Sequence, residues 1–230
     1  PDQRAKGVAA WNEGWDEDVR AIPPGRVSEI ALREIARHPD KRFIIHYCQP
    51  HAPYLNYPEL NRQKYDKERN PTFREDTAWE HLKLITADIL TRLGGTELIW
   101  RLNRRFDVMK PKNLEFIWRH LGREGIVEGY RYNLGLVLDE VAQLLPRLSG
   151  RVVVTADHGE LLGDNRLYGH GDPLPAKPEL FEVPWYVVEC DGEPRDKRPR
   201  DADATERARI ASAVKKLQRQ GQRSDTNDHA

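Results

Sequence analysis

An adjacent aspartate and histidine at the start of the C-terminal third of the chain have the types and spacing of metal ligands. Asp157 and His158 directly follow the branched run Arg151–Ala156, RVVVTA, and His170 lies in the loop beyond. A carboxylate and an imidazole at the end of a strand can ligate one ion if the backbone turns sharply, as Gly159 permits. The alternative interpretation is that Asp157 caps a turn and His158 is an ordinary polar loop residue.

The type of ligand limits the type of ion. An imidazole ligand favours Zn²⁺ or Mn²⁺ over Ca²⁺, which takes oxygen donors. Glu160 follows closely enough to be a hydrogen-bond partner of a metal ligand. The sequence therefore predicts a divalent metal ion as cofactor, with zinc or manganese favoured over calcium.

A second histidine-containing segment precedes these residues. Arg42–Cys48, RFIIHYC, is rich in branched and aromatic residues and is followed by Gln49-Pro50 and then His51, which predicts a strand that ends just before His51. His46 lies inside this run. A buried, hydrogen-bonded histidine is the favoured interpretation of His46, because buried polar groups are normally satisfied.

The surrounding patterns predict the elements that would position these residues. Apolar residues at helical spacing predict helices at 27–38 and Tyr130–Leu148, and strands are predicted at Arg151–Ala156, buried on both faces, and Val183–Cys190. Alternation of helix and strand is typical of an α/β fold with a mostly parallel sheet flanked by helices. Ligands of such sheets bind at the carboxyl ends of the strands, where Asp157 and His158 lie.

The rest of the chain predicts one domain with two additions. Gly7–Trp11 is a candidate short strand, Leu55–Arg74 is a candidate long loop, and a helical insertion is expected at about 75–125. We expect residues 1–190 to form the domain. Residues 191–230, dense in charged residues, are expected to form a solvated, partly disordered tail.

Composition excludes several classes of partner. Thirty-seven lysines and arginines balance thirty-seven aspartates and glutamates, so nucleic acid is not an expected partner. No apolar run is long enough to span a membrane. Cys48 and Cys190 match no metal or redox spacing and are expected to be reduced and buried. A cytoplasmic location is the expectation that fits this pattern.

The motifs also resemble those of a known family. TADHGELLGDNRLYGHGDPLPAKPELFEVPWYVV is similar to the sulfatase and phosphoethanolamine-transferase branch of the alkaline phosphatase superfamily, in which (S/T)-x-D-H-G-E-x-L-G precedes a glycine-rich loop, a further histidine and a V-P strand. RFIIHYCQPHAPY resembles the family's strand ending in P-H-x-P. The helix with Tyr130 and Asp139 resembles the helix before the D-H-G strand. The resemblance covers Pro39–Tyr54 and Tyr130–Cys190, and archaeal sulfatase-like proteins look closest.

The resemblance implies a fold, a reaction and roles for four residues. The implied fold is an alkaline-phosphatase-like three-layer sandwich, and the implied activity is metal-dependent hydrolysis or transfer of sulfate or phosphate esters, with a small anionic ester as substrate. Asp157 and His158 are implied metal ligands. His170 is implied to hold the metal or the transferred anion, and His51 to contact that anion. Histidine rather than asparagine at position 158 favours phosphate-type esters.

One component of the family's site has no counterpart in the sequence. The family's nucleophilic Ser, Thr or Cys and an acidic metal ligand precede the P-H-x-P strand, and no such pattern precedes His46. Two explanations stay open: the chain begins after that segment, or the protein has kept the scaffold and lost the nucleophile. The second makes a catalytically inactive binding or assembly protein the alternative function.

Overall fold

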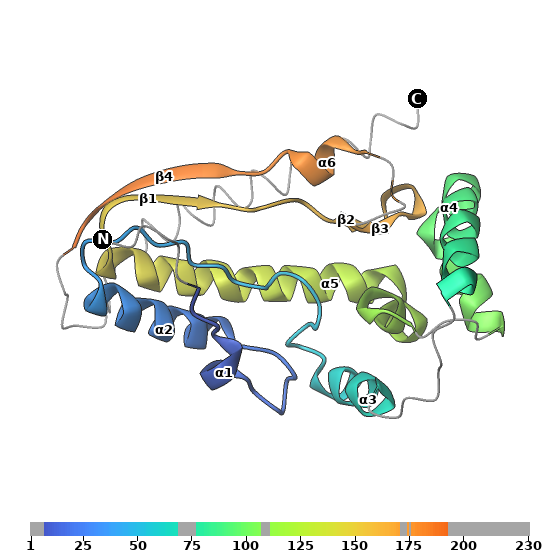
Figure 1. Ribbon diagram of the computed structural model, residues 1–230, viewed down its shortest axis with the longest axis horizontal. Coiled ribbons are helices and arrows are strands. Elements are labelled where there is room, and N and C mark those ends of the chain that lie inside the picture. The colour runs from blue at the N-terminus through green and yellow to red at the C-terminus, as the bar shows by residue number, and fades with distance from the viewer. Residues whose placement is uncertain (1–6, 69–76, 107–110, 171–173, 175, 193–230) are drawn as a thin grey trace.

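Helices make up most of the structure, and its strands form only two small antiparallel sheets (Figure 1). The structure is a computed structural model, which describes residues 7–68, 77–106, 111–170, 174 and 176–192. Its helices are α1 (Trp11–Gly14), α2 (Pro24–Arg37), α3 (Pro58–Glu68), α4 (Thr77–Phe106), α5 (Asn113–Leu144) and α6 (Pro178–Phe181), with 3₁₀ turns η1 (Leu145–Arg147) and η2 (Asp164–Arg166). Its strands are β1 (Ser149–Thr155), β2 (Leu161–Leu162), β3 (Tyr168–Gly169) and β4 (Trp185–Asp191).

Helix α2 confirms the helix predicted at 27–38. Pro24 occupies its first turn, where a missing N–H is tolerated, and Arg37 lies in its last turn, where a positive charge is favourable. Val27 and Ile30 are buried on one face, and the helix packs against α5. This contact fixes the start of the extended segment that leads to His51.

Helix α5 is the longest element and carries the main core. Gly122 has a φ of 67°, a left-handed conformation that bends the helix near its start. The residues buried around it form one cluster: Tyr54, Trp100, Ile117, Ile126 and Tyr168. Gly129 lets the ring of Tyr54 lie directly on α5, because a Cβ at this position would be 2.1 Å from the ring.

Strands β1 and β4 form a two-stranded antiparallel ribbon that runs alongside α5 (Figure 1). Ser149 is opposite Asp191 at one end, and Thr155 is opposite Trp185 at the other. Exposed residues predominate along both strands, with part-buried ones between them. The second sheet is a short hairpin in which β2 pairs with β3.

The predicted mostly parallel sheet, and with it the three-layer α/β sandwich, is wrong for the described residues. β1 pairs with β4 in the antiparallel direction, and Arg42–Cys48 is extended without pairing to any strand described here. The prediction that β1 is buried on both faces is also wrong. Branched residues favour strands, and β1 and β4 form where such runs predicted them, but the strand predicted at Arg42–Cys48 is not formed and burial was predicted incorrectly.

Three local predictions also differ from the structure. Residues 55–74, expected to be a loop, include α3, a polar helix built from good helix formers such as Glu59 and Lys64. Gly7–Trp11 forms no strand, and α1 begins at Trp11. Cys48 and Cys190 are free thiols, as expected. Neither is buried, because Cys48 is exposed and Cys190 is of intermediate exposure.

The remaining predictions concern the middle and the end of the chain. Helices α4 and the first part of α5 occupy much of the range 75–125, where a helical insertion was predicted. The tail predicted at 191–230 lies outside the described residues from position 193 onward. Among the helices that the structure describes, none has the length and apolar character needed to cross a membrane.

Candidate metal centre

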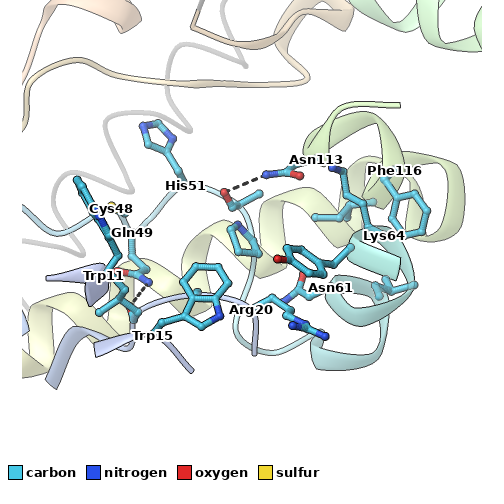
Figure 2. Close-up of a pocket in the computed structure, with 17 residues that line it drawn as sticks. Trp11, Trp15, Arg20, Cys48, Gln49, His51, Asn61, Lys64, Asn113 and Phe116 are labelled. Carbon is cyan, nitrogen blue, oxygen red and sulfur yellow. Dashed lines mark hydrogen bonds between the residues drawn. The ribbon is translucent and has the colours of Figure 1, made fainter. Parts of the chain in front are cut away.

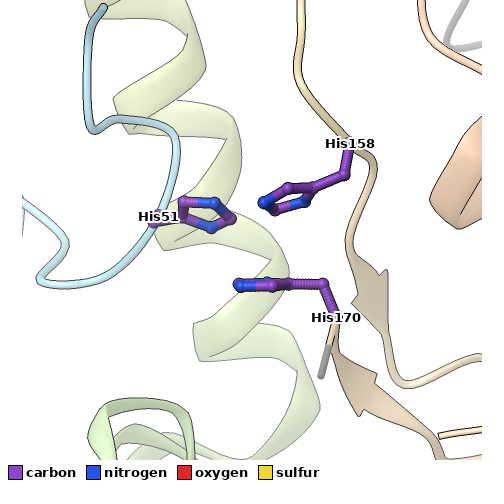
Figure 3. Close-up of side chains that lie close together, drawn as sticks. All are labelled: His51, His158 and His170. Atoms are coloured by element: carbon purple, nitrogen blue, oxygen red, sulfur yellow. The ribbon is translucent and has the colours of Figure 1, made fainter. Parts of the chain in front are cut away.

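Three histidines from separate segments converge beside α5 (Figure 3). One ring nitrogen from each of His51, His158 and His170 can be chosen so that all lie within 4.8 Å of one another. The ring centroids are 5.1 Å apart for His51 and His158, 4.6 Å for His51 and His170, and 4.1 Å for His158 and His170. Figure 3 shows the stacked rings of His158 and His170 extending toward His51, which faces them from the opposite side. Three side chains that can each carry a proton or bind a metal ion therefore lie close together.

The turn that carries His51 is held by one buried side chain of α5. Asn133 is fully buried, and its Oδ1 accepts a hydrogen bond from the N–H of Leu55 at 2.9 Å. Its Nδ2 donates to the carbonyl oxygens of His51 at 2.9 Å and Pro53 at 3.1 Å. Because a buried amide that satisfies several backbone groups is costly to remove, Asn133 fixes where His51 lies.

A close backbone contact fixes the loop that carries His158. The N–H of Gly159 donates to the carbonyl of Leu180 at 3.0 Å. A Cβ at position 159 would lie 1.8 Å from the carbonyl oxygen of Glu179, so only glycine allows this approach. The sequence predicted that Gly159 allows a sharp turn of the backbone. Its role in the structure is close packing against the α6 segment.

The β2–β3 hairpin brings His170 back beside Glu160. Leu161 pairs with Gly169, so the residues that flank this pair, Glu160 and His170, lie opposite each other. Gly163 has a φ of 105°, which lets the chain reverse between the strands. Arg123 of α5 clamps the reversal, donating to the carbonyl of Leu162 and to the carboxylate of Asp164.

Glu160 connects two of the three histidines. Its side chain is only 3% exposed, and its two oxygens accept from Nδ1 of His51 at 2.8 Å and from Nδ1 of His170 at 3.3 Å. A carboxylate accepts and does not donate when ionised, so each Nδ1 carries a proton, and when the imidazole is neutral its Nε2 has a lone pair available. This is the arrangement in which a carboxylate orients histidine ligands of a metal.

His158 reaches the same tautomer through the backbone. Its Nδ1 donates to the carbonyl oxygen of Gly159 at 2.9 Å, and its Nε2 lies 3.7 Å from Oδ2 of Asp157. A carbonyl oxygen can only accept, so Nδ1 carries a proton, and Nε2 keeps its lone pair when the ring is neutral. All three histidines therefore present the same nitrogen as a possible ligand.

Charge around the centre is dominated by carboxylates. The hydrogen bond that His51 donates to Glu160 raises the pKa of His51, and the charges of Glu160 and Asp157 add to this effect, whereas burial opposes it. Slight burial raises the pKa of Asp157, but backbone N–H bonds and the nearby His158 and His46 outweigh burial and lower it. The centre thus stabilises positive charge, whether it is carried by a proton or by a cation.

Two buried phenols lie near Glu160 and supply no charge to balance it. Burial raises the pKa of Tyr130 to about 12 and raises that of Tyr54 further, and the charge of Glu160 contributes to both. The Tyr54 hydroxyl has no hydrogen-bond partner among the described residues. A buried carboxylate is costly unless positive charge compensates it. The hydrogen bonds from His51 and His170 compensate this carboxylate, and a positive charge on either ring would compensate it further.

The donor set fits a divalent transition metal. Three imidazoles suit zinc and similar ions and leave a fourth position open, as in catalytic zinc sites. In a tetrahedron with Zn–N bonds of about 2.1 Å, the nitrogens would be about 3.4 Å apart. Nitrogen separations of up to 4.8 Å therefore require small ring movements toward the ion.

The predicted site residues are brought together unevenly. His51, His158 and His170 form the cluster, whereas Asp157 lies at its edge with an exposed side chain, 3.9 Å from Nε2 of His46. His46 was expected to be buried, and its side chain is 70% exposed because the segment around it joins no sheet described here. The roles of these residues as metal or substrate ligands stay predictions.

Sequence reasoning missed Asn133, and it singled out Glu160 without its link to His51. Asn133 had no sequence signal beyond a polar residue inside an apolar helix pattern, which often marks a buried hydrogen-bonding role. Glu160 was expected to be a partner of a metal ligand, but its link to His51 crosses 109 positions of sequence and no local pattern reveals it. Long-range pairing of this kind depends on the fold.

Comparison with known proteins adds no assignment to this geometry. Searches with protein-family models, among curated proteins and among solved structures find no match to the chain.

Proposed function

We propose that the protein is a metal-dependent hydrolase or transferase acting on phosphate or sulfate esters. The observation that carries the proposal is the convergence of His51, His158 and His170, each with Nδ1 engaged and Nε2 available. The resemblance of the D-H-G-E and P-H-x-P segments to sulfatase-type motifs supports this ester class. We include in the proposal a preference for zinc or manganese over calcium.

Different residues of the chain would have different roles at this site. The three imidazoles would hold the ion, and Glu160 would keep two of them in the binding tautomer. A bound divalent ion would supply Lewis acidity toward an ester oxygen. Asp157, exposed beside His158, would accept a hydrogen bond from an incoming group or act as a further ligand. Ester transfer depends mainly on positioning and electrostatics, which such a cluster provides.

A specific observation favours the second candidate function, a non-catalytic binding or assembly protein. Among the hydrogen bonds of the described residues, none joins a Ser, Thr or Cys side chain to the three histidines. The side-chain hydroxyl of Thr155 donates to the carbonyl of Pro184 at 2.7 Å and is engaged there. The histidine centre would then bind an ion or an anion without transferring a group.

Metal binding is the first test. The purified chain, stripped with a chelator and titrated with Zn²⁺, Mn²⁺ and Ca²⁺ in a calorimeter, is expected to bind one zinc or manganese ion and to bind calcium more weakly. His158→Ala should abolish stoichiometric binding. His38→Ala, which removes an exposed histidine at the end of α2, is the matched control and should leave it unchanged. Equal binding by both variants would refute the centre.

Turnover separates the two candidate functions. Hydrolysis of 4-nitrophenyl phosphate and 4-nitrophenyl sulfate is measured with the metal-loaded chain and with His158→Ala. Turnover that requires both the metal and His158 would support the ester hydrolase. Stoichiometric metal binding with no turnover of either ester would support the binding or assembly protein.

A further inference from the structure

A pocket of about 510 Å³ borders the turn that carries His51 (Figure 2). It lies between the N-terminal segment, this turn, α3 and the start of α5. Its volume is in the range of small-molecule sites, about 300–1,000 Å³. His51 is one of its lining residues, and Figure 2 shows its ring at the edge of the lining, away from Trp15. The pocket and the histidine centre therefore share a residue.

Aromatic rings form much of the pocket wall. Trp11, Trp15, Tyr65 and Phe116 line it, and both tryptophans are partly exposed. Clustered exposed aromatic residues often mark a binding surface, and the flat faces of tryptophans are suited to stacking with a planar ring. The wall thus favours a ligand with an aromatic group.

The charged residues of the lining are cationic. Arg20 and Lys64 belong to it, and no aspartate or glutamate does. Arg20 lies over the ring of Tyr65, 4.3 Å from its centroid, and is paired with Glu17 outside the lining. A wall with positive and no negative side chains attracts an anion. The charge pattern therefore selects an aromatic group attached to a negative one.

A buried acceptor in the wall specifies the ligand further. Gln49 is 5% exposed, and its Nε2 donates to the carbonyl of Ile22 at 2.9 Å. Its Oε1 is buried and accepts no hydrogen bond from the described residues. Buried acceptors are normally satisfied, so a donor brought by a ligand would complete this group. An N–H or O–H on the aromatic ring would do so.

We infer that the pocket binds the organic part of an anionic aryl ester whose ring carries a hydrogen-bond donor. The ring would stack against the tryptophans and donate to Oε1 of Gln49. The anionic end would lie toward His51. This inference deepens the proposed function, on which its assignment to an ester rests. Binding of the ring itself requires no metal, so it can be tested alone.

Calorimetry on the metal-free chain tests the inference without turnover. The probes are 3-indoxyl phosphate and 1-naphthyl phosphate, which are similar in size but differ in a ring N–H, with inorganic phosphate as the reference. We expect 3-indoxyl phosphate to bind at least about tenfold more tightly than inorganic phosphate, because its ring stacks. It should bind about threefold to tenfold more tightly than 1-naphthyl phosphate, because its N–H pairs with Gln49.

Variants locate the binding. Trp15→Ala should weaken 3-indoxyl phosphate by about tenfold, and Lys64→Gln should weaken both aryl phosphates. Trp185→Ala, which removes an exposed tryptophan from β4, is the control and should change nothing. Gln49→Met should remove the preference for the indoxyl probe, with circular dichroism used to verify its fold. Equal affinities for all three probes, or undiminished binding in both Trp15→Ala and Lys64→Gln, would overturn the inference.

Failure of this inference differs from failure of the proposed function. If the pocket is not used, the aryl phosphates bind no better than inorganic phosphate while metal-dependent turnover of 4-nitrophenyl phosphate persists. If the ester function is wrong, turnover is absent while the metal-free chain still binds 3-indoxyl phosphate in a manner that depends on Trp15.

Discussion

The β1–β4 ribbon and the histidine centre that follows it differ in how many contacts hold them to the rest of the protein. The β1–β4 ribbon is a pair of strands with mostly exposed residues, supported by its own cross-strand hydrogen bonds. The histidine centre beyond it is attached to α5 by Asn133 and Arg123 and includes the buried Glu160. The contrast shows that β1 leads the chain to the histidine centre, whereas contacts with α5 fix the positions of the side chains there. Substitutions in the two regions should therefore have different consequences.

The largest expected difference is between Asn133→Ala and Val153→Ala. Removing the Asn133 side chain leaves the Leu55 N–H and two carbonyl oxygens without their partner, at about 1–3 kcal/mol for each buried group. We expect the free energy of unfolding in urea to fall by about 3 kcal/mol or more. Val153→Ala in the ribbon should cost about 1 kcal/mol or less, since Val153 is exposed. Similar losses of unfolding free energy in the two variants would show that the ribbon contributes as much to stability as the contacts of α5.

Gly129→Ala and Gly135→Ala compare a packed and an open position on the same helix. A Cβ at position 129 would meet the ring of Tyr54 at 2.1 Å, which should cost about 1–3 kcal/mol through displacement of that ring. A Cβ at position 135 meets nothing within 4 Å, so alanine there should stabilise α5 by up to about 1 kcal/mol. Thermal unfolding of both variants measures this. A loss at position 135 would contradict the open packing described there.

Glu160→Gln tests whether the buried carboxylate organises the centre. A neutral amide cannot accept from both histidines through two oxygens, so the rings should lose their fixed tautomer. We expect zinc affinity to fall about 10- to 100-fold, as for other residues that orient metal ligands. Glu189→Gln in the ribbon, whose side chain pairs with Arg151 on the surface, is the control and should leave affinity unchanged. Unchanged affinity in Glu160→Gln would refute this role.

The smallest effect is the pH dependence of the metal-free protein. Its hydrogen bond to Glu160 raises the pKa of His51 above the unfolded value, so His51 adds stability that is fully present below the unfolded pKa of about 6.5 and is lost as pH rises through the folded pKa. Because His51 is partly exposed, we expect less than about 1 kcal/mol. Urea unfolding of wild type and His51→Gln at pH 5 and pH 8 should differ more at pH 5.

Metal binding should reverse this dependence on pH. Zinc requires the neutral imidazole and displaces the proton that Glu160 stabilises, so zinc affinity should rise as pH rises through the pKa of His51. Calorimetric titration with zinc over the same pH range measures the change. Zinc affinity that falls with pH would exclude His51 as a ligand.

Local structure was predictable where one segment determines it. The helix at 27–38 and the strand at Arg151–Ala156 follow from apolar spacing and branched residues, and α2 and β1 match them closely. Strand pairing was not predictable. The β2–β3 hairpin and α6 separate β1 from its partner β4 in the sequence, and a run of branched residues is equally compatible with a parallel neighbour. The parallel sheet failed for this reason.

The candidate site was predictable in its residue types and not in its supports. His158 stands out because it follows an extended run, whereas His51 and His170 were singled out by the resemblance of their segments to sulfatase-type motifs. Their convergence depends on Asn133 and Glu160, which contact residues far away in the sequence. A resemblance of motifs can point to ligands, but hydrogen bonds between distant segments set their orientation.

The open side of the β1–β4 ribbon has a consequence for how the protein behaves in solution. Within the described residues β1 pairs only with β4, and Val152–Val154 give its free edge an uncharged, branched middle. Ile44, in the unpaired segment that leads to His51, is 98% exposed. Unpaired strand edges of this kind are templates for another chain. Concentrated samples should therefore self-associate slowly, and an added charge, as in Val153→Lys, should suppress it.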